Sequence, residues 1–415
     1  PSVSSTNMNT SNDKNNDRSN NQTLTSNISD LDEREANTTK DIIEGDTVKV
    51  HMNGNFVFKH ARCLVKRNIN LFVLVVCEDL TLNRRFNLEE GVNENVKEVV
   101  VYYSYPFKFL KQFYKILAYL KGLKYLKQKE FNINLIHVNV LIDAGFIALL
   151  LNYLKKIPYI ITEHSSIFSP LNPITYSKFL KPLIKKTIQR SKYILPVSNE
   201  LGDNIRKISS VVPYKKIPNV VDENIFKLSD QRVGERNINF LHVSSFAKLK
   251  NVEGILSVIK KLSLQRTDFS ITIAGDGDLE EIKNMAKEKN IQRDYINFHG
   301  TMNETEIAEI FQSHDVFVLF SDYENLPCVL LEAQMCGMPL IATNVGGVSE
   351  ILSNEQDGIL IEAGDEIGLF NSLNQMIDNI DKYNPSLIRE RAIKQYSEKV
   401  VTDNFIEIYK NVLSL

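Results

Sequence analysis

Two glutamates in one short stretch form the most informative pattern in this chain. Glu324 and Glu332 lie eight residues apart and follow an apolar run, Asp315–Phe320, while Pro327 between them suits the first turn of a helix. A strand that runs into a helix leaves unpaired N–H groups at the carboxyl edge of a sheet, which favours a phosphate. One carboxylate could accept hydrogen bonds from sugar hydroxyls and the other from a ribose. The two glutamates could equally be solvated residues of an ordinary strand–helix unit.

Short β-branched runs alternate with helical segments from about residue 45 onward, which predicts a mostly parallel sheet in each half of the chain. Residues 222–237 are polar and weakly periodic, so we place the domain boundary there. The predicted strands are Thr47–Met52, which is weak, Leu71–Cys77, Glu98–Tyr103, Leu135–Val140, Tyr159–Thr162, Lys192–Val197, Ile238–Ser244, Phe269–Ala274, Tyr295–Phe298, Val316–Phe320, Pro339–Thr343 and Gly358–Ile361.

The composition bounds the class of protein. The chain has 415 residues, 43% of them hydrophobic, with 49 Lys and Arg against 51 Asp and Glu, which is typical of a folded two-domain protein and excludes nucleic-acid binding by bulk charge. Four scattered cysteines and no apolar run of membrane-spanning length favour the cytoplasm. Residues 41–220 carry a net charge of +13 and residues 221–415 carry −13, so the first half is expected to meet something anionic. Residues 1–40 are expected to form a disordered tail, because they are rich in Asn, Ser and Thr.

A series of motifs resembles one enzyme family. The stretch Ser321–Glu350 resembles the Glu-x7-Glu motif of retaining GT-B glycosyltransferases, specifically glycosyltransferase family 4. The resemblance extends from about residue 54 to the C-terminus. Its further matches are GNFVFKHARCL (Gly54–Leu64), YIITEHSS (Tyr159–Ser166), YILPVSNELGDNI (Tyr193–Ile205), PNVVDENIF (Pro218–Phe226), ITIAGDGDLEE (Ile271–Glu281) and YINFHGTM (Tyr295–Met302).

The resemblance implies roles for individual residues. Glu324 would hold hydroxyls of the donor sugar, Glu332 would hold the ribose of the nucleotide, and His164 would reach the donor sugar from the first domain. Backbone N–H groups around Cys328–Leu330 would cradle the diphosphate. The implied catalytic residues are Glu324, His164 and Lys250, and the implied donor-binding residues are Glu332, Lys248, Gly54, Asn55, Gly275, Asn325, Leu326, Pro327, Cys328, Val329, Leu330, Gly300 and Thr301.

The cationic part of the implied site departs from the family pattern. The family usually places an Arg and a Lys after the first strand of the second domain, and here Lys250 falls at the Lys position while Ser245 stands at the Arg position. Lys248 could supply the missing charge, or both lysines could belong to a solvated loop. Asp276 and Asp278 have the Asp-x-Asp shape of a divalent-cation site, but we favour a tight glycine turn after a strand and expect no metal and no cofactor.

The segment Tyr105–Lys129 carries seven lysines interleaved with Phe and Tyr at helical spacing. Such a basic amphipathic helix can lie on an anionic membrane surface, although a core helix with a solvated basic face is the alternative.

Taken together, these features predict an α/β protein of GT-B architecture, with two Rossmann-like doubly wound domains that face a cleft. We expect a disordered tail at 1–40, an acceptor-side domain at 41–222, a nucleotide-sugar-binding domain at 223–395, and a helix at 396–415 that crosses back to the first domain. The expected activity is metal-independent transfer of a sugar, with retention, from a nucleotide-sugar to a lipid-linked or glycan acceptor in surface polysaccharide or glycolipid synthesis. The cytoplasmic protein would contact the inner face of the membrane peripherally. The rivals are another GT-B enzyme, such as a nucleotide-sugar epimerase or an inverting transferase, and a catalytically silent nucleotide-sugar-binding subunit.

Overall fold

The computed structural model describes residues 55–168, 180–228 and 237–414. The expected tail, the weak strand Thr47–Met52 and Gly54 lie outside the described residues. The described helices are α2 (Asn55–Lys66), α3 (Lys111–Gln128), α4 (Ala144–Lys155), α5 (Leu180–Arg190), α6 (Asn199–Arg206), α7 (Val252–Leu262), α8 (Leu279–Glu288), α9 (Glu304–Gln312), α10 (Cys328–Met335), α11 (Val348–Ile351), α12 (Glu366–Asn379), α13 (Pro385–Tyr396) and α14 (Glu398–Leu413).

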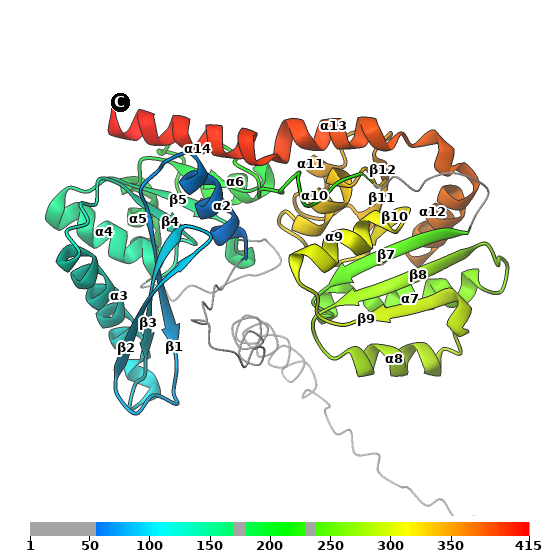
Figure 1. The fold of residues 1–415 in the computed structure, drawn as a ribbon, viewed down its shortest axis with the longest axis horizontal. Helices are drawn as coiled ribbons and strands as arrows, with labels where there is room; N and C mark the ends of the chain where they lie inside the picture. The colour runs from blue at the N-terminus through cyan, green and yellow to red at the C-terminus, as the bar shows by residue number, and fades with distance from the viewer. Residues whose placement is uncertain (1–54, 169–179, 229–236, 415) are drawn as a thin grey trace, which may run out of the picture. The chain divides into compact units, whose positions relative to one another are not determined.

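The first half of the chain contains two three-stranded sheets, with the strand orders β1-β3-β2 and β4-β5-β6 (Figure 1). The second of these sheets is parallel, and β1 also pairs with β3 in parallel. The strands are β1 (Phe72–Glu78), β2 (Phe86–Asn93), β3 (Val96–Tyr103), β4 (Ile136–Asn139), β5 (Tyr159–Glu163) and β6 (Ile194–Pro196). The sequence predicted five of these strands.

Strand β2 is the exception, because the sequence pattern did not indicate it. It pairs antiparallel with β3 through a two-residue connection, Glu94 and Asn95, both of which have positive φ (42° and 67°). Positive φ at both central residues is the geometry of a type I′ hairpin turn, whose twist matches that of the strands. The prediction of a mostly parallel sheet therefore holds here except at this hairpin.

The second half forms one parallel sheet of six strands in the order β12-β11-β10-β7-β8-β9. The order runs outward in both directions from β7 and β10, so the sheet is doubly wound. Each residue of β10 is buried, as expected for a strand covered on both faces. The strands are β7 (Ile238–Ser244), β8 (Phe269–Gly275), β9 (Ile296–His299), β10 (Val316–Leu319), β11 (Leu340–Thr343) and β12 (Gly358–Ile361), and the sequence predicted all six.

The last helix packs against the first half of the chain. Ser397 caps α14 in an extended conformation and separates it from α13, and α14 then contacts α2 (Figure 1). The side chains of Val401, Phe405 and Ile408 enter one hydrophobic cluster with residues of α2, β5 and β6. Within the described part of the chain, no helix is both long enough and apolar enough to cross a bilayer.

A buried histidine in β7 makes stability depend on pH. The Nδ1–H of His242 donates to the Val318 carbonyl at 2.9 Å, and the Ser244 hydroxyl donates to Nε2 at 2.8 Å. Burial lowers the pKa of His242 to about 4, the Val318 carbonyl opposes this shift, and Lys250 adds to it. The imidazole is therefore neutral in the folded protein at neutral pH.

We expect the native protein to lose stability more steeply than a His242→Asn variant as the pH falls. The unfolded histidine binds a proton below its ordinary pKa of about 6.5, whereas the folded one does not until about 4, so acid favours unfolding in this window. Between about pH 7 and pH 5 the difference amounts to about 2 kcal/mol. Urea unfolding at both pH values measures it, with His299→Asn at an exposed position as the control. Equal pH slopes in the native protein and the His242 variant would contradict the neutral buried imidazole.

Candidate nucleotide-sugar site

The connection from β10 to α10 carries Glu324 and brings it to Lys250. Glu324 is buried, and the Lys250 ammonium donates to its Oε1 at 2.8 Å. Lys250 ends a short 3-10 helix, Lys248–Lys250, that follows β7. Because β7 and β10 are parallel neighbours, their carboxyl ends meet at the same edge of the sheet. The parallel pairing of β7 with β10 therefore brings the Lys250 ammonium and the Glu324 carboxylate together.

Backbone contacts hold this connection in place. The Asp322 N–H donates to the Leu249 carbonyl at 2.7 Å, and the Gly347 N–H donates to the Asn325 carbonyl at 2.9 Å. Gly346 has φ of +53°, and a Cβ there would lie 1.5 Å from the carbonyl oxygen of Glu324. Only glycine fits this close approach. The sequence reasoning missed both glycines, although the Gly-Gly pair within the stretch Ser321–Glu350 was a usable signal.

Pro327 precedes α10 with φ of −67° and extended ψ, and the helix starts at Cys328 as expected. The amides of Cys328 and Val329, in the first turn of α10, have no acceptor within the helix. The Leu330 N–H, in contrast, donates to the Pro327 carbonyl at 3.1 Å. Leu326 is anchored from the other half of the chain, since the Asn219 amide donates to its carbonyl at 3.2 Å. Leu330 is fully buried. Burial raises the pKa of the Cys328 thiol to about 12, so it stays protonated and is no nucleophile at neutral pH.

His164 lies directly after β5 and meets the same connection. Its carbonyl accepts a hydrogen bond from the Asn325 amide at 2.7 Å, and its ring stacks on Phe56 of α2 with 4.0 Å between ring centroids. Both ring nitrogens of His164 are buried, and the side chain of Asn219 is the polar group that raises the pKa of this ring. Burial lowers the pKa of His164 well below its ordinary value, and the neighbouring His60 and His137 act in the same direction. The neutral ring can exchange hydrogen bonds with hydroxyl groups but carries no positive charge.

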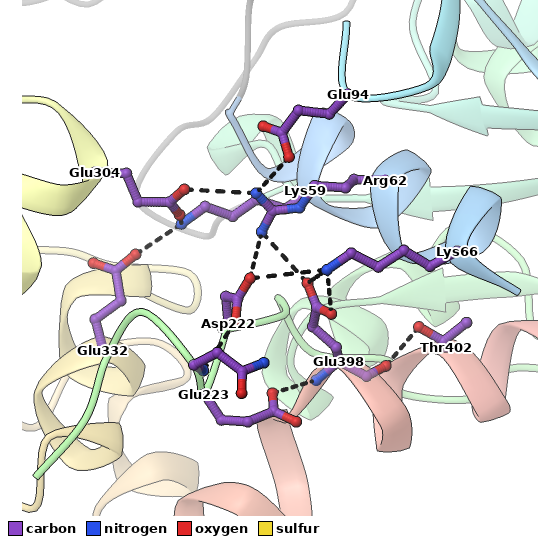
Figure 2. Close-up of polar contacts among 11 residues, drawn as sticks. Lys59, Arg62, Lys66, Glu94, Asp222, Glu223, Glu304, Glu332, Glu398 and Thr402 are labelled. Carbon is purple, nitrogen blue, oxygen red and sulfur yellow. Dashed lines mark hydrogen bonds and ion pairs between the residues drawn. The ribbon is translucent and has the colours of Figure 1, made fainter.

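Glu332 lies inside α10 and meets a residue that the sequence reasoning did not single out. The Lys59 ammonium, from α2, lies 3.0 Å from its Oε1 (Figure 2). The same ammonium lies 2.9 Å from Oε1 of Glu304 at the start of α9. The spacing of Lys59, Arg62 and Lys66 on one face of α2 was the available sequence signal.

The other candidates lie at the edges of this arrangement. Gly275 ends β8 with φ of +144°, and a Cβ there would lie 1.7 Å from the Ser244 carbonyl oxygen, so glycine is required. Gly300, in contrast, has room for a Cβ, and Thr301 beside it is exposed. Lys248 is exposed and, among the described residues, makes no ion pair with either glutamate. Gly54 lies outside the described residues, and Asn55 is described only as the first residue of α2.

Asp278, the second half of the possible metal pair, caps a helix. Its carboxylate accepts a hydrogen bond at 3.0 Å from the N–H of Glu281 in the first turn of α8. Within the described residues, no cluster of three or more His, Cys, Asp or Glu could hold a metal ion. The capping contact agrees with the turn that the sequence favoured at this position.

A doubly wound parallel sheet with a polar site at the carboxyl ends of its strands, preceded by a second α/β unit, defines a protein of GT-B architecture. Solved structures share this fold. The chain superimposes on sucrose-phosphate synthase from Thermosynechococcus elongatus with a TM-score of 0.70 at 16% identity, covering 86% of this chain and 93% of that one. It superimposes on Anabaena HepE, solved with UDP and glucose, with a TM-score of 0.67 at 16% identity, covering 88% of this chain and 98% of that one.

The sequence comparisons identify the family. Residues 54–224 match the family model described as Glycosyltransferase Family 4, and residues 226–397 match the model described as Glycosyl transferases group 1. The chain belongs to this family of glycosyltransferases. It is 26% identical over 312 residues to the N-acetyl-alpha-D-glucosaminyl L-malate synthase of Bacillus anthracis, covering 72% of this chain and 79% of that protein. It is 24% identical over 313 residues to the 2-deoxystreptamine N-acetyl-D-glucosaminyltransferase of Niallia circulans, covering 69% and 78%.

Proposed function

We propose that this glycosyltransferase moves a sugar, with retention at the anomeric carbon, from a nucleoside-diphosphate donor to an acceptor hydroxyl. The observation that carries this proposal is the 2.8 Å contact between Lys250 and Glu324 beside the first turn of α10, with Glu332 further along the same helix. This arrangement supplies a cation, free amides and two carboxylates at one edge of the sheet. These are the groups that a diphosphate, a sugar and a ribose require.

Each group has a chemical task in the proposed reaction. As the bond between the anomeric carbon and the phosphate oxygen breaks, negative charge grows on the diphosphate, and Lys250 and the first-turn amides of α10 stabilise it. Glu324 and His164 accept hydrogen bonds from the sugar hydroxyls. The acceptor oxygen forms its new bond on the face that the leaving group departs from, and the departing phosphate oxygen takes the acceptor proton. The positive charge comes from the protein, so no metal ion and no cofactor enters the proposed reaction.

Relatives suggest which donors to test first. HepE was solved with UDP-glucose, and the two relatives named above carry N-acetylglucosamine in their names. UDP-glucose and UDP-N-acetylglucosamine should therefore lead a panel that also contains GDP- and ADP-sugars. Nucleotide release with and without acceptor, in the presence and absence of EDTA, measures turnover, and NMR of the product gives its anomeric configuration.

The same experiment separates the rivals. An inverted product, or epimerised donor without transfer, would replace the proposal with another GT-B reaction. Nucleotide binding without turnover on any donor would instead favour a catalytically silent subunit. Ser245, at the position where the family usually has an arginine, keeps that second outcome worth testing.

A lipid-linked acceptor is the finer part of the proposal, and three helices of the first half support it. Helices α3, α4 and α5 lie side by side (Figure 1), and their sequences contain ten Lys or Arg residues and no Asp or Glu. Large apolar side chains are exposed on and beside the same helices, and Phe109 is the most exposed of them at 81%. We call this surface the basic apolar face; its exposed apolar members are Phe107, Phe109, Phe113, Ile116, Leu120, Leu150, Tyr153, Leu154, Leu180 and Leu183.

Apolar side chains between lysines fit an anionic membrane, because the rings enter the interface while the ammonium groups meet lipid phosphates. A protein that docks there would hold its acceptor side near the membrane in which a lipid-linked acceptor resides. We propose peripheral contact with the inner face of the cytoplasmic membrane, and synthesis of a surface polysaccharide or glycolipid, on this basis.

We expect the protein to sediment with anionic liposomes at low salt and to be released at high salt, since the attraction decays within a Debye length of ~8 Å at physiological salt. Replacing Lys121, Lys124 and Lys127 with Glu should weaken binding by more than about 100-fold, because each lysine contributes on the order of 1 kcal/mol. Liposome sedimentation over a salt series measures both effects.

The charge-matched control replaces three other lysines with Glu. These are Lys261, Lys287 and Lys382, which are exposed in the second half of the chain. This control should bind liposomes like the native protein, and both variants should keep nucleotide binding. A native protein that ignores anionic liposomes even at low salt would leave the basic apolar face as a solvated surface. A water-soluble acceptor would then be the better proposal.

A further inference from the structure

Three cations on one face of α2 contact acidic groups that lie far away in the sequence (Figure 2). Arg62 lies 3.1 Å from Asp222, and Lys66 lies 2.7 Å from Glu398 at the start of α14. Lys66 is half exposed, at 49% of its side chain, so its ion pair is screened by water. Lys59 differs from both, because one of its partners, Glu332, belongs to the proposed donor site.

The Lys59 ammonium joins two carboxylates in a buried setting. It lies 3.0 Å from Oε1 of Glu332 and 2.9 Å from Oε1 of Glu304, and its side chain is 7% exposed against 9% for Glu332. Burial alone would lower the pKa of Lys59, but Glu332 and then Glu304 outweigh it, so that pKa is raised and the ammonium stays charged. Two carboxylates that share so buried a position without this cation would repel each other.

Only one oxygen of Glu332 is used by this contact. Among the described residues, the hydrogen bond from Lys59 goes to Oε1, which leaves Oε2 to accept a hydroxyl. Among the described residues, Arg62 lies 3.7 Å from Glu304, and the Cys328 thiol beside the pair stays neutral because burial raises its pKa. His60 next to Lys59 also stays neutral at neutral pH, because burial, and to a smaller extent Lys59, lower its pKa to about 4. Lys59 is therefore the cation in direct contact with Glu332.

We propose that Lys59 is a positioning residue of the donor site, which orients the Glu332 carboxylate so that its second oxygen receives the ribose hydroxyls. This inference rests on the proposed function and adds to it a requirement from the first half of the chain. The Glu304 carboxylate also contacts this ammonium, at 2.9 Å, so Lys59 is held by two partners.

The decisive variant is Lys59→Met, which keeps an unbranched side chain of similar size and removes its charge. We expect the nucleotides that the native protein binds, among UDP, GDP and ADP, to bind at least about tenfold more weakly to it, the loss expected for one hydrogen bond to a charged group. Calorimetric titration of the nucleotides measures the affinity, and thermal unfolding of the same variant reports whether the fold survives.

Three further variants separate positioning from a general role in folding. Lys59→Arg should bind within about threefold of the native protein, since the charge is kept. Lys66→Met, on the same helix but away from Glu332, should bind like the native protein. The double variant Lys59→Met/Glu304→Gln removes the second carboxylate, so it should fold even if the single variant does not, and it should still bind nucleotide more weakly than the native protein because Glu332 lacks its cation.

Native-like or tighter nucleotide binding by Lys59→Met would overturn the inference, and tighter binding would make Lys59 a block to the site. Loss of binding in Lys59→Arg equal to that in Lys59→Met would do the same. A native protein that binds none of UDP, GDP and ADP would instead contradict the proposed function itself. The two failures are therefore distinguishable.

Discussion

Lys250→Ala should lower turnover by about 100- to 1,000-fold, because one preorganised donor to charge that develops in the transition state contributes ~2.7 to 4 kcal/mol. Lys250 is held by Glu324 at 2.8 Å, so the cation is in place before the diphosphate develops charge. The effect should fall on kcat, because the charge grows during the reaction rather than on binding. Steady-state kinetics of nucleotide release on the best donor of the panel measures it.

Lys248→Ala is the matched control, since Lys248 lies two residues earlier, is exposed and contacts neither glutamate. Its turnover should stay within a few-fold of native. Comparable losses in the two variants would show that two lysines replace the arginine that the family usually has at the position of Ser245. Full activity in Lys250→Ala would contradict both versions.

Glu332→Gln should weaken nucleotide binding by about 1 to 3 kcal/mol, the range for loss of a hydrogen bond to a charged group. The amide keeps the shape of the side chain but loses the charge that both Lys59 and a ribose hydroxyl would use. Calorimetry with UDP and GDP measures the affinity, and thermal unfolding reports whether the fold survives.

Glu309→Gln, on the exposed side of α9, serves as the control and should leave affinity unchanged. Unchanged nucleotide binding in the Glu332 variant would remove the ribose role from this residue. It would leave Glu332 as a partner of Lys59 alone.

Strands buried on both faces were predictable from the sequence. The run Val316–Phe320 is wholly apolar, and β10 at Val316–Leu319 follows it closely. Strand β2 escaped prediction because its residues, FNLEEGVN, include two adjacent glutamates and a glycine, and its turn is Glu-Asn rather than the Asn-Gly that signals a hairpin. Glu94 and Asn95 adopt positive φ because the pairing of β2 with β3 requires it. The local sequence preference of these two residues alone does not favour positive φ.

Some contacts of the candidate site were likewise predictable from the sequence, and others were not. The meeting of Glu324 with Lys250 follows from the parallel register of β7 and β10, which periodicity reveals. The meeting of Glu332 with Lys59 does not follow from any local pattern, because 273 residues separate them and the contact joins side chains of α2 and α10. Likewise, the Gly-Gly pair at Gly346 was visible, but its purpose became clear only with the carbonyl of Glu324 beside it.

The packing of α14 on α2 has a consequence for how the chain is made. The cluster around Cys63, Leu64, Ile160 and Leu195 is closed by Val401, Phe405 and Ile408, which a ribosome adds long after those residues. Until then the growing chain must leave this apolar surface uncovered, at a stage when such surfaces favour aggregation and chaperone binding. The first half of the chain therefore completes this part of its fold only after the second half has been made, and deletion of α14 would uncover apolar surface in the first half.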